Sequence, residues 1–216
     1  MIYFKSLYEF LFKAASAALF GILLLIAFVI TAKMGSHEFY GLFRYDCLLF
    51  YALIIQACLL YLRLESWAEA KVIALFHIMA MGMEIFLTHP QIASWQYPQP
   101  AVFKILTVPL FAGFMYSAVG SFFARSLRLY QVSFLNLPSF ANMLSLALLS
   151  YINFMSKFFI PDFRNVLFIW SVVIFWKTKI RFQLQQHEFQ LPMLPVLVVL
   201  AFIIWVAENI STFNKI

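Results

Sequence analysis

The chain has 216 residues, of which 64% are apolar and 11% carry a charge, whereas soluble domains carry about 25% charged residues. A chain this apolar has too few polar side chains to cover a surface that faces water, which excludes an ordinary soluble globular protein. The composition indicates instead that lipid surrounds most of the chain. The net charge of +6 comes from Lys and Arg residues scattered without a basic run, so we interpret it as a topology signal and expect no nucleic-acid partner.

Seven apolar stretches predict membrane-spanning helices, since a span needs about 20 mostly apolar residues. In chain order they are 14–32, 45–62, 70–87, 105–123, 139–156, 164–178 and 191–209. We expect no strands, because the alternation of polar and apolar residues is absent and the apolar runs are too long. No flexible linker divides the chain. The sequence therefore predicts an all-α fold, a polytopic transmembrane bundle of about seven helices forming a single domain over 1–216.

The first apolar stretch resembles a signal peptide because Lys5 and Lys13 precede it. It is longer than a typical signal-peptide core and no small-residue cleavage site follows, so we expect a retained helix. Lys and Arg are more frequent in the segments that share a side with the N-terminus than in those opposite. This bias predicts a multi-pass membrane protein with a cytoplasmic N-terminus.

Two acidic residues, Glu84 and Glu208, each follow an unbroken apolar stretch within a predicted helix. An ionised carboxylate there costs on the order of 3 kcal/mol and must face the bundle interior, water or a partner. Four other acids fall in predicted cytoplasmic segments, where a solvated surface explains them. These are Glu9, Glu65, Glu69 and Glu188.

His77, Met81 and Glu84 share one helix face by their spacing. An interhelical hydrogen bond is the ordinary explanation for His77, and a structural bond to Tyr, Trp or backbone is the ordinary explanation for Glu84. The loop that follows, 88–100, contains three prolines and supplies an imidazole, an indole and a phenol beside Glu84. It could form a lid over a polar pocket, although its aromatic residues also suit the membrane interface.

An internal repeat is suggested by Glu-x-x-x-Thr at 84–88 and at 208–212, and by Phe-Arg at 43–44 and 163–164. A duplicated four-helix unit in parallel orientation would place both carboxylates across a pseudo-two-fold axis. The sequence would then be a truncated four-plus-four repeat, with an eighth helix expected beyond residue 216.

Residues 83–130 carry a specific pattern: Met-Glu at 83–84, Ser-Trp-Gln-Tyr-Pro-Gln-Pro at 94–100, Val-Pro-Leu-Phe-Ala-Gly-Phe-Met-Tyr at 108–116, Ala-Val-Gly-Ser at 118–121 and Ala-Arg at 124–125. Together with 153–154 and 205–213, this pattern resembles the YoaT-like family of bacterial integral membrane proteins (domain of unknown function 817). The chain departs from the family at Ala93 and Thr107, where glycine is expected, and it stops where the family continues with a second Trp-x-Tyr-Pro segment and a last helix. The resemblance implies a multi-pass protein of the bacterial inner (cytoplasmic) membrane and supplies no established reaction.

Three function classes stay open, and the sequence does not decide whether the chain is an enzyme. The first is a membrane-embedded enzyme acting on a lipid-like or isoprenoid substrate, with Glu84 and Glu208 as catalytic acid and base, by faint analogy to membrane carotenoid cyclases and hydratases. The second is a small-solute or proton-coupled transporter, and the third is a structural or assembly subunit in which Gly113 and Gly120 serve helix packing. The expected substrate-binding residues are His77, His89, Trp95, Tyr97, Tyr116 and Asn209.

The histidines stand apart, with none at a metal-ligand spacing, and the sequence has no phosphate-binding loop or dinucleotide fingerprint. We therefore expect no metal and no cofactor. The expected partners are the lipid bilayer, a lipid-like ligand in the enzyme hypothesis, and a second copy of the chain if the protein oligomerises.

Overall fold

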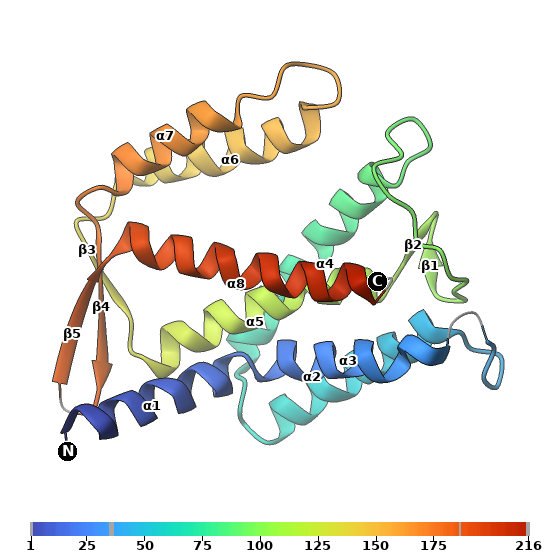
Figure 1. The fold of residues 1–216 in the computed structure, drawn as a ribbon, viewed down its shortest axis with the longest axis horizontal. Helices are drawn as coiled ribbons and strands as arrows, with labels where there is room; N and C mark the ends of the chain where they lie inside the picture. The colour runs from blue at the N-terminus through green and yellow to red at the C-terminus, as the bar shows by residue number, and fades with distance from the viewer. Residues whose placement is uncertain (1, 35–36, 186, 215–216) are drawn as a thin grey trace. The chain divides into compact units, whose positions relative to one another are not determined.

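The computed structural model describes residues 2–34, 37–185 and 187–214, and these are mostly helical, with eight α-helices and five short strands (Figure 1). Two compact units can be distinguished. The first comprises Met1–Leu129 with Ile204–Ile216, and the second comprises Tyr130–Ile203. The single domain expected over 1–216 stays a prediction.

The first unit begins with α1 (Ile2–Ala17) and α2 (Leu19–Thr31), followed by the short 3-10 helix η1 (Ala32–Met34). The chain bends by 61° between the first two helices, so the helix predicted over 14–32 is divided at Ala18. Its apolar run crosses the bend, and composition alone carries no signal for a break at Ala18. After a loop come α3 (Arg44–Tyr61), α4 (Trp67–Leu87) and α5 (Ala112–Leu129), while α8 (Met193–Phe213) ends in this unit.

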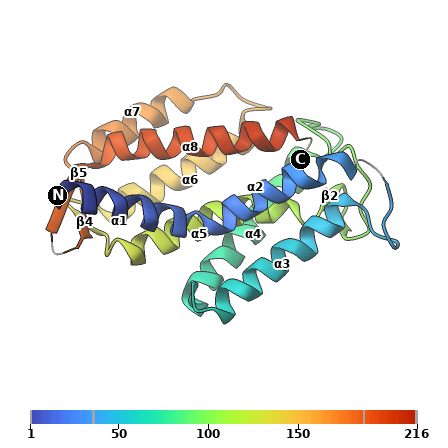
Figure 2. The same cartoon turned by 60° about the horizontal axis from the view of Figure 1, so that its bottom comes forward.

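The core of the first unit lies between α2 and α3, which pack side by side (Figure 2), and it is closed by the beginning of α5. Phe28 meets Phe111 edge to face, with ring centroids 5.5 Å apart. The guanidinium of buried Arg44 donates to the carbonyl oxygens of Phe28 and Asn214, both over 2.9 Å. Carbonyls at the end of a helix have no partner within the helix, so Arg44 satisfies α2 and the end of α8 together.

The start of α4 carries a capping box, which explains why the helix begins at Trp67. The backbone N–H of Glu69 donates to the Ser66 hydroxyl over 3.3 Å, and the Ser66 N–H donates to the Glu69 carboxylate over 2.7 Å. These bonds satisfy two amide groups that the first turn leaves free.

Between α4 and α5 the chain forms a long loop with a two-stranded antiparallel ladder, β1 (Lys104–Ile105) and β2 (Val108–Pro109). The helix predicted over 105–123 is therefore shifted, because it begins at Ala112 and continues to Leu129. Proline disfavours a helical conformation in the residue before it, so Pro109 keeps Val108 extended and delays the start of α5.

The second unit contains β3 (Ser133–Leu135), α6 (Phe140–Ser156), α7 (Arg164–Phe175), β4 (Lys179–Leu184) and β5 (His187–Pro192). The strands form one antiparallel sheet in the order β3-β4-β5. The expectation of no strands is wrong, although Lys-Ile-Arg-Phe-Gln-Leu at 179–184 shows the required alternation. At the α6–α7 turn, Arg164 and Asn153 hold the pKa of the Asp162 carboxyl well below its usual range.

Three described helices, α3, α4 and α8, are long and apolar enough to cross a membrane, and the bent α1–α2 pair makes a fourth if it counts as one span. The apolar helices α6 and α7 are shorter. Composition and helix length therefore indicate membrane association. The predicted bundle of seven spans and the predicted internal repeat are not confirmed. Both Phe-Arg pairs do lie at helix starts, at α3 and α7.

Candidate functional site

Glu84 lies in the last turns of α4, and its side chain is buried at 1% exposure. Three aromatic side chains donate hydrogen bonds to its carboxylate. The Trp95 indole N–H and the Tyr97 hydroxyl reach Oε2 over 2.9 and 2.8 Å, and the Tyr116 hydroxyl reaches Oε1 over 2.9 Å. We call these four residues the Glu84 cluster.

The loop between α4 and α5 carries two of these donors, and it is fastened back onto the end of α4. The Thr88 hydroxyl donates to the Glu84 carbonyl over 2.8 Å and shares a hydrogen bond with the Thr107 hydroxyl. Further along, the Ser94 N–H donates to the Leu87 carbonyl over 3.0 Å. Local bonds therefore place Trp95 and Tyr97 beside a carboxylate more than ten residues earlier in the chain.

A second anchor for this loop is Asp46, in the first turn of α3. Its buried carboxylate accepts the backbone N–H groups of Val102 and Phe103, the shortest bond being 2.8 Å, as well as that of Phe43. The neighbouring Tyr45 ring meets the Tyr97 ring edge to face, with centroids 5.7 Å apart. The beginning of α3 thus positions the aromatic donors of Glu84.

The chemistry of the Glu84 cluster is that of a negative charge held by neutral donors. An ionised carboxylate only accepts hydrogen bonds, and among the described residues no Lys, Arg or His lies within ion-pair distance of Glu84. Burial, together with the adjacent carboxylate, raises the pKa of Tyr97 above its ordinary value, so Tyr97 stays a hydrogen-bond donor. The three donors therefore satisfy a buried carboxylate that has no cationic partner among the described residues.

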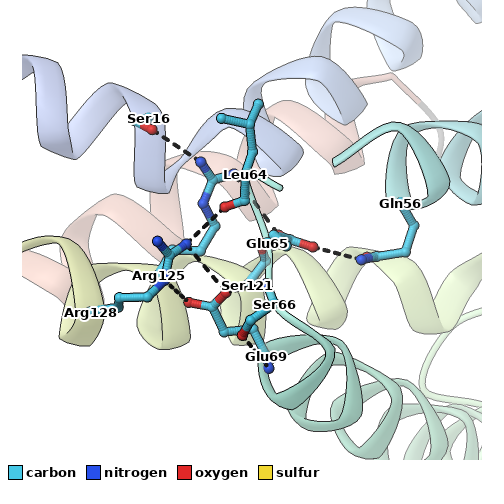
Figure 3. A network of polar contacts seen from close by, with 9 residues as sticks. All are labelled: Ser16, Gln56, Leu64, Glu65, Ser66, Glu69, Ser121, Arg125 and Arg128. Atoms are coloured by element: carbon cyan, nitrogen blue, oxygen red, sulfur yellow. Dashed lines mark hydrogen bonds and ion pairs between the residues drawn. The ribbon is translucent and has the colours of Figure 1, made fainter. Parts of the chain in front are cut away.

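A second buried polar cluster lies at the opposite end of α4 and α5, where α1, α3 and the 62–66 loop also converge (Figure 3). Glu65 accepts a hydrogen bond from Gln56 over 2.6 Å and another from Ser121, and its Oε1 lies 3.9 Å from Nη1 of Arg125. Arg125 also donates to the Ser16 hydroxyl over 3.0 Å. We call this the Glu65–Arg125 cluster.

A second ion pair borders this cluster. Arg128 donates from Nε to Glu69 over 2.7 Å and from Nη2 to the Leu64 carbonyl over 2.8 Å. Glu65 and Glu69 are only 3% and 7% exposed, so the predicted solvated surface is wrong for both. An acid in a short loop normally faces water, and only the packing of α5 over the loop encloses these two.

Between the two clusters, α4 and α5 approach closely at glycines. A Cβ on Gly113 would lie 2.5 Å from Nδ1 of His77, and one on Gly120 would lie 2.9 Å from Cγ of Phe76. Such distances leave no room for a side chain, so the packing role expected of both glycines agrees with the structure. The Ser117 hydroxyl, also in this interface, donates to the carbonyl oxygens of Ile73 and Gly113 over 3.2 and 3.0 Å.

Comparison with known proteins gives a family for this chain. The model of the family described as "Protein of unknown function (DUF817)" matches residues 6–216. The chain belongs to the DUF817 family. The uncharacterized protein YoaT of Bacillus subtilis is 35% identical over 170 residues, which are 79% of this chain and 64% of YoaT. No solved structure matches.

The sequence motif that carried the resemblance to this family is also a unit in space. Glu84, Trp95, Tyr97 and Tyr116 come from separate parts of the motif and meet at one carboxylate. The two close-packed glycines and Arg125 lie within the motif as well. In this DUF817 protein, the motif therefore builds the Glu84 cluster and contributes Ser121 and Arg125 to the Glu65–Arg125 cluster.

The other predicted site residues lie apart from the Glu84 carboxylate. Half-buried His77 packs against Phe114, with ring centroids 4.5 Å apart and the ring planes tilted by 55°, and exposed His89 accepts a hydrogen bond from the Gln91 N–H. Glu208 and Asn209 are both exposed on α8, where Asn209 bonds the Trp205 carbonyl. The structure thus does not enclose Glu208 in a cavity with Glu84, because no residue of α8 is buried.

Neither cluster resembles a metal site. Within the described ranges, no three His, Cys, Asp or Glu residues gather closely enough to hold a metal ion. An open hollow in the second unit contains none of the predicted site residues. It is lined by Asn136, Leu137, Pro138, Val172, Val173, Ile174, Trp176 and Lys177.

Gly113→Ala should lower the free energy of unfolding by about 1–3 kcal/mol, the usual cost of overpacking, because the added methyl collides with His77. Thermal unfolding in detergent, followed by circular dichroism, measures the change. Gly82→Ala is the matched control. It lies in α4 with no atom within 4 Å of the added Cβ, and alanine favours the helix by about 1 kcal/mol. Equal melting temperatures for the two variants would contradict the close approach.

Proposed function

We propose that this DUF817 protein is a membrane-embedded enzyme that acts on a lipid-like or isoprenoid substrate, with Glu84 as its proton-exchanging acid. The observation that carries the proposal is the buried Glu84 carboxylate, which three aromatic donors hold without a described cationic partner. Ionisable groups at such positions in apolar helices usually serve function, because their burial costs stability.

The proposal includes a multi-pass arrangement in the bacterial inner membrane with a cytoplasmic N-terminus. The apolar helices α3, α4 and α8 support it. Helix α8 has no buried residue, and it exposes large apolar side chains such as Phe202, Ile203 and Trp205. A continuous apolar surface of this kind is stable against acyl chains but not against water.

The proposed chemistry is proton transfer to an electron-rich, apolar substrate. Protonated Glu84 gives its proton to one carbon of a C=C bond, the π electrons form the new C–H bond, and the other carbon becomes cationic. The faces of Trp95 and Tyr97 can stabilise that cation, while the donor groups hold the carboxylate that remains. Return of a proton from a neighbouring carbon to Glu84 completes an isomerisation without any co-reactant.

Glu84→Gln tests this role. In infrared difference spectra of the purified protein in nanodiscs, the wild type should show a carboxylic acid C=O band, and Glu84→Gln should lack it. Glu188→Gln, on the exposed hairpin, is the control that should keep the band. Lipid extracted from the purified protein should be converted about 10²–10⁴-fold more slowly by Glu84→Gln, the usual contribution of a general acid.

Two results would contradict the enzyme proposal. The first is a wild-type spectrum without a band that Glu84→Gln removes. The second is a combination of two findings: Glu84→Gln unfolds, and the wild type does not convert the lipids extracted from the purified protein. Together these findings favour a purely structural role for the carboxylate.

A proton-coupled carrier is the second candidate, and the Glu65–Arg125 cluster favours it. This cluster places buried ionisable groups at the end of α4–α5 opposite to Glu84, as a pathway between two sides of a membrane requires. Uptake of a solute into proteoliposomes, driven by a pH gradient and lost in Glu84→Gln, would favour the carrier over the enzyme.

A further inference from the structure

We infer that the interface between α4 and α5 is a proton path that connects the Glu65–Arg125 cluster with Glu84, and that His77 is the proton carrier between them. The inference rests on the proposed function in one respect, since Glu84 must exchange a proton. It adds the side from which that proton comes and the residue that passes it on.

Polar groups follow the α5 side of this interface at intervals of one helical turn. Arg125, Ser121 and Ser117 are four residues apart, and they therefore share one face. All three are almost fully buried, at 1%, 0% and 0% exposure. Buried polar groups cost free energy unless they are hydrogen-bonded, so each member of this row needs a partner in the interface.

The α4 side supplies groups that meet this row. Ser121 donates to Glu65 just before α4, and Ser117 donates to the Ile73 carbonyl in the middle of the helix. His77 lies one turn further on, against Gly113. Beyond it, the Tyr116 hydroxyl of α5 bonds Glu84 of α4. The two helices thus present polar groups to each other from one cluster to the other.

Several buried atoms along this line have no hydrogen-bond partner among the described residues. They are Oε1 of Gln56, Nε and Nη1 of Arg125, and Nδ1 of His77. Buried polar atoms are nearly always satisfied, by ordered water when protein groups are absent. The atoms of Gln56 and Arg125 lie in the Glu65–Arg125 cluster, and the atom of His77 lies midway to Glu84, so bridging waters bind at these two places. Chains of hydrogen-bonded water conduct protons.

His77 has the chemistry and the position of an intermediate carrier. A neutral imidazole accepts a proton at one nitrogen and releases one from the other. His77 is eight residues after Glu69 and seven before Glu84, which corresponds to about 12 and about 10 Å along the helix. Both gaps are too long for a direct hydrogen bond and fit short chains of water and hydroxyl groups.

Charged and titratable side chains face the path at both of its ends. Glu65, Glu69, Arg125 and Arg128 form its entrance, where acid and base are paired. Tyr97 and Tyr116 face Glu84 at the other end, and Phe114 packs on His77 between them. Lys71 is exposed on α4 and takes no part.

The test measures how fast Glu84 responds to a proton released in solution. The protein in nanodiscs is mixed with a caged proton, a light flash releases the proton, and time-resolved infrared spectroscopy follows the carboxylic acid band that Glu84→Gln removes. His77→Phe should slow the appearance of this band at least tenfold while leaving its final amplitude unchanged. His187→Phe, an exposed histidine of the β4–β5 hairpin, is the matched control and should keep the wild-type rate.

Two further variants keep the test decisive if His77→Phe does not fold. His77→Gln preserves a polar side chain but cannot carry a proton, and Ser121→Ala removes the hydroxyl bonded to Glu65; both should slow the band. Wild-type rates in these variants would overturn the path while leaving Glu84 as the acid. A wild type without any Glu84 band would instead overturn the proposed function, and the path with it.

Discussion

Replacing Arg125 by methionine is expected to lower the free energy of unfolding by about 3–5 kcal/mol, the cost of breaking a buried ion pair by removing one partner. Arg125 is 1% exposed, and its partner Glu65 is 3% exposed. Methionine has a similar length, so the loss of charge dominates over the loss of volume. Among the described residues, Gln56 and Ser121 would then be the donors that remain to the buried Glu65 carboxylate. Thermal unfolding in detergent, monitored by circular dichroism, measures the effect.

Arg128→Met is the matched control for this prediction. Arg128 also pairs with a glutamate, but its side chain is 45% exposed, so water screens the attraction between the two charges. Arg128→Met should therefore lower the free energy of unfolding by about 1 kcal/mol or less. The double variant Arg125→Met with Glu65→Gln should regain much of the stability, because no uncompensated charge then stays buried. Equal losses for the two arginine variants would contradict the enclosed ion pair.

Asp46→Ala is expected to cost about 3 kcal/mol and to release the loop that carries Trp95 and Tyr97. Hydrogen bonds to a charged group contribute about 1.5–3 kcal/mol each, without strict additivity, and Asp46 accepts from two loop amides and one at the start of α3. Hydrogen–deuterium exchange should show much faster exchange at the amides of Val102 and Phe103.

The control for the loop anchor is Glu188→Ala, which breaks an exposed ion pair with Arg181. It should change stability by less than about 1 kcal/mol and leave exchange in the loop unaltered. Asp46→Asn should fall between the wild type and Asp46→Ala, since its amide oxygen still accepts hydrogen bonds. Unchanged protection of Val102 in Asp46→Ala would show that Tyr45, Tyr97 and the threonine pair hold the loop without Asp46.

Long apolar runs with clear ends were the most predictable part of the fold. The predicted helices over 45–62, 70–87 and 139–156 agree with α3, α4 and α6 to within a few residues. The apolar run over 14–32 contains a bend between α1 and α2, and the run over 105–123 begins within a two-stranded ladder that precedes α5. Hydropathy reports whether a segment is apolar, but it does not report where the backbone changes direction.

The Glu84 cluster was partly predictable, because a carboxylate in an apolar helix must find donors and the next loop is rich in them. The choice of Trp95, Tyr97 and Tyr116, with His89 left exposed, depended on how the loop returns to α4. The Glu65–Arg125 cluster had one visible signal, the Ser66-x-x-Glu69 capping pattern. That pattern places the start of a helix without indicating burial.

The sequence by itself determined the apolar, helix-rich character of this chain, its membership of the DUF817 family and the need to satisfy Glu84, since these follow from composition, motif and the cost of burying a charge. Only the tertiary structure decided which acids are enclosed. It buried Glu65, Glu69 and Asp46 and left Glu208 exposed. The reason is physical: burial is a property of the elements that pack over a residue, and for these acids those elements come from distant parts of the chain.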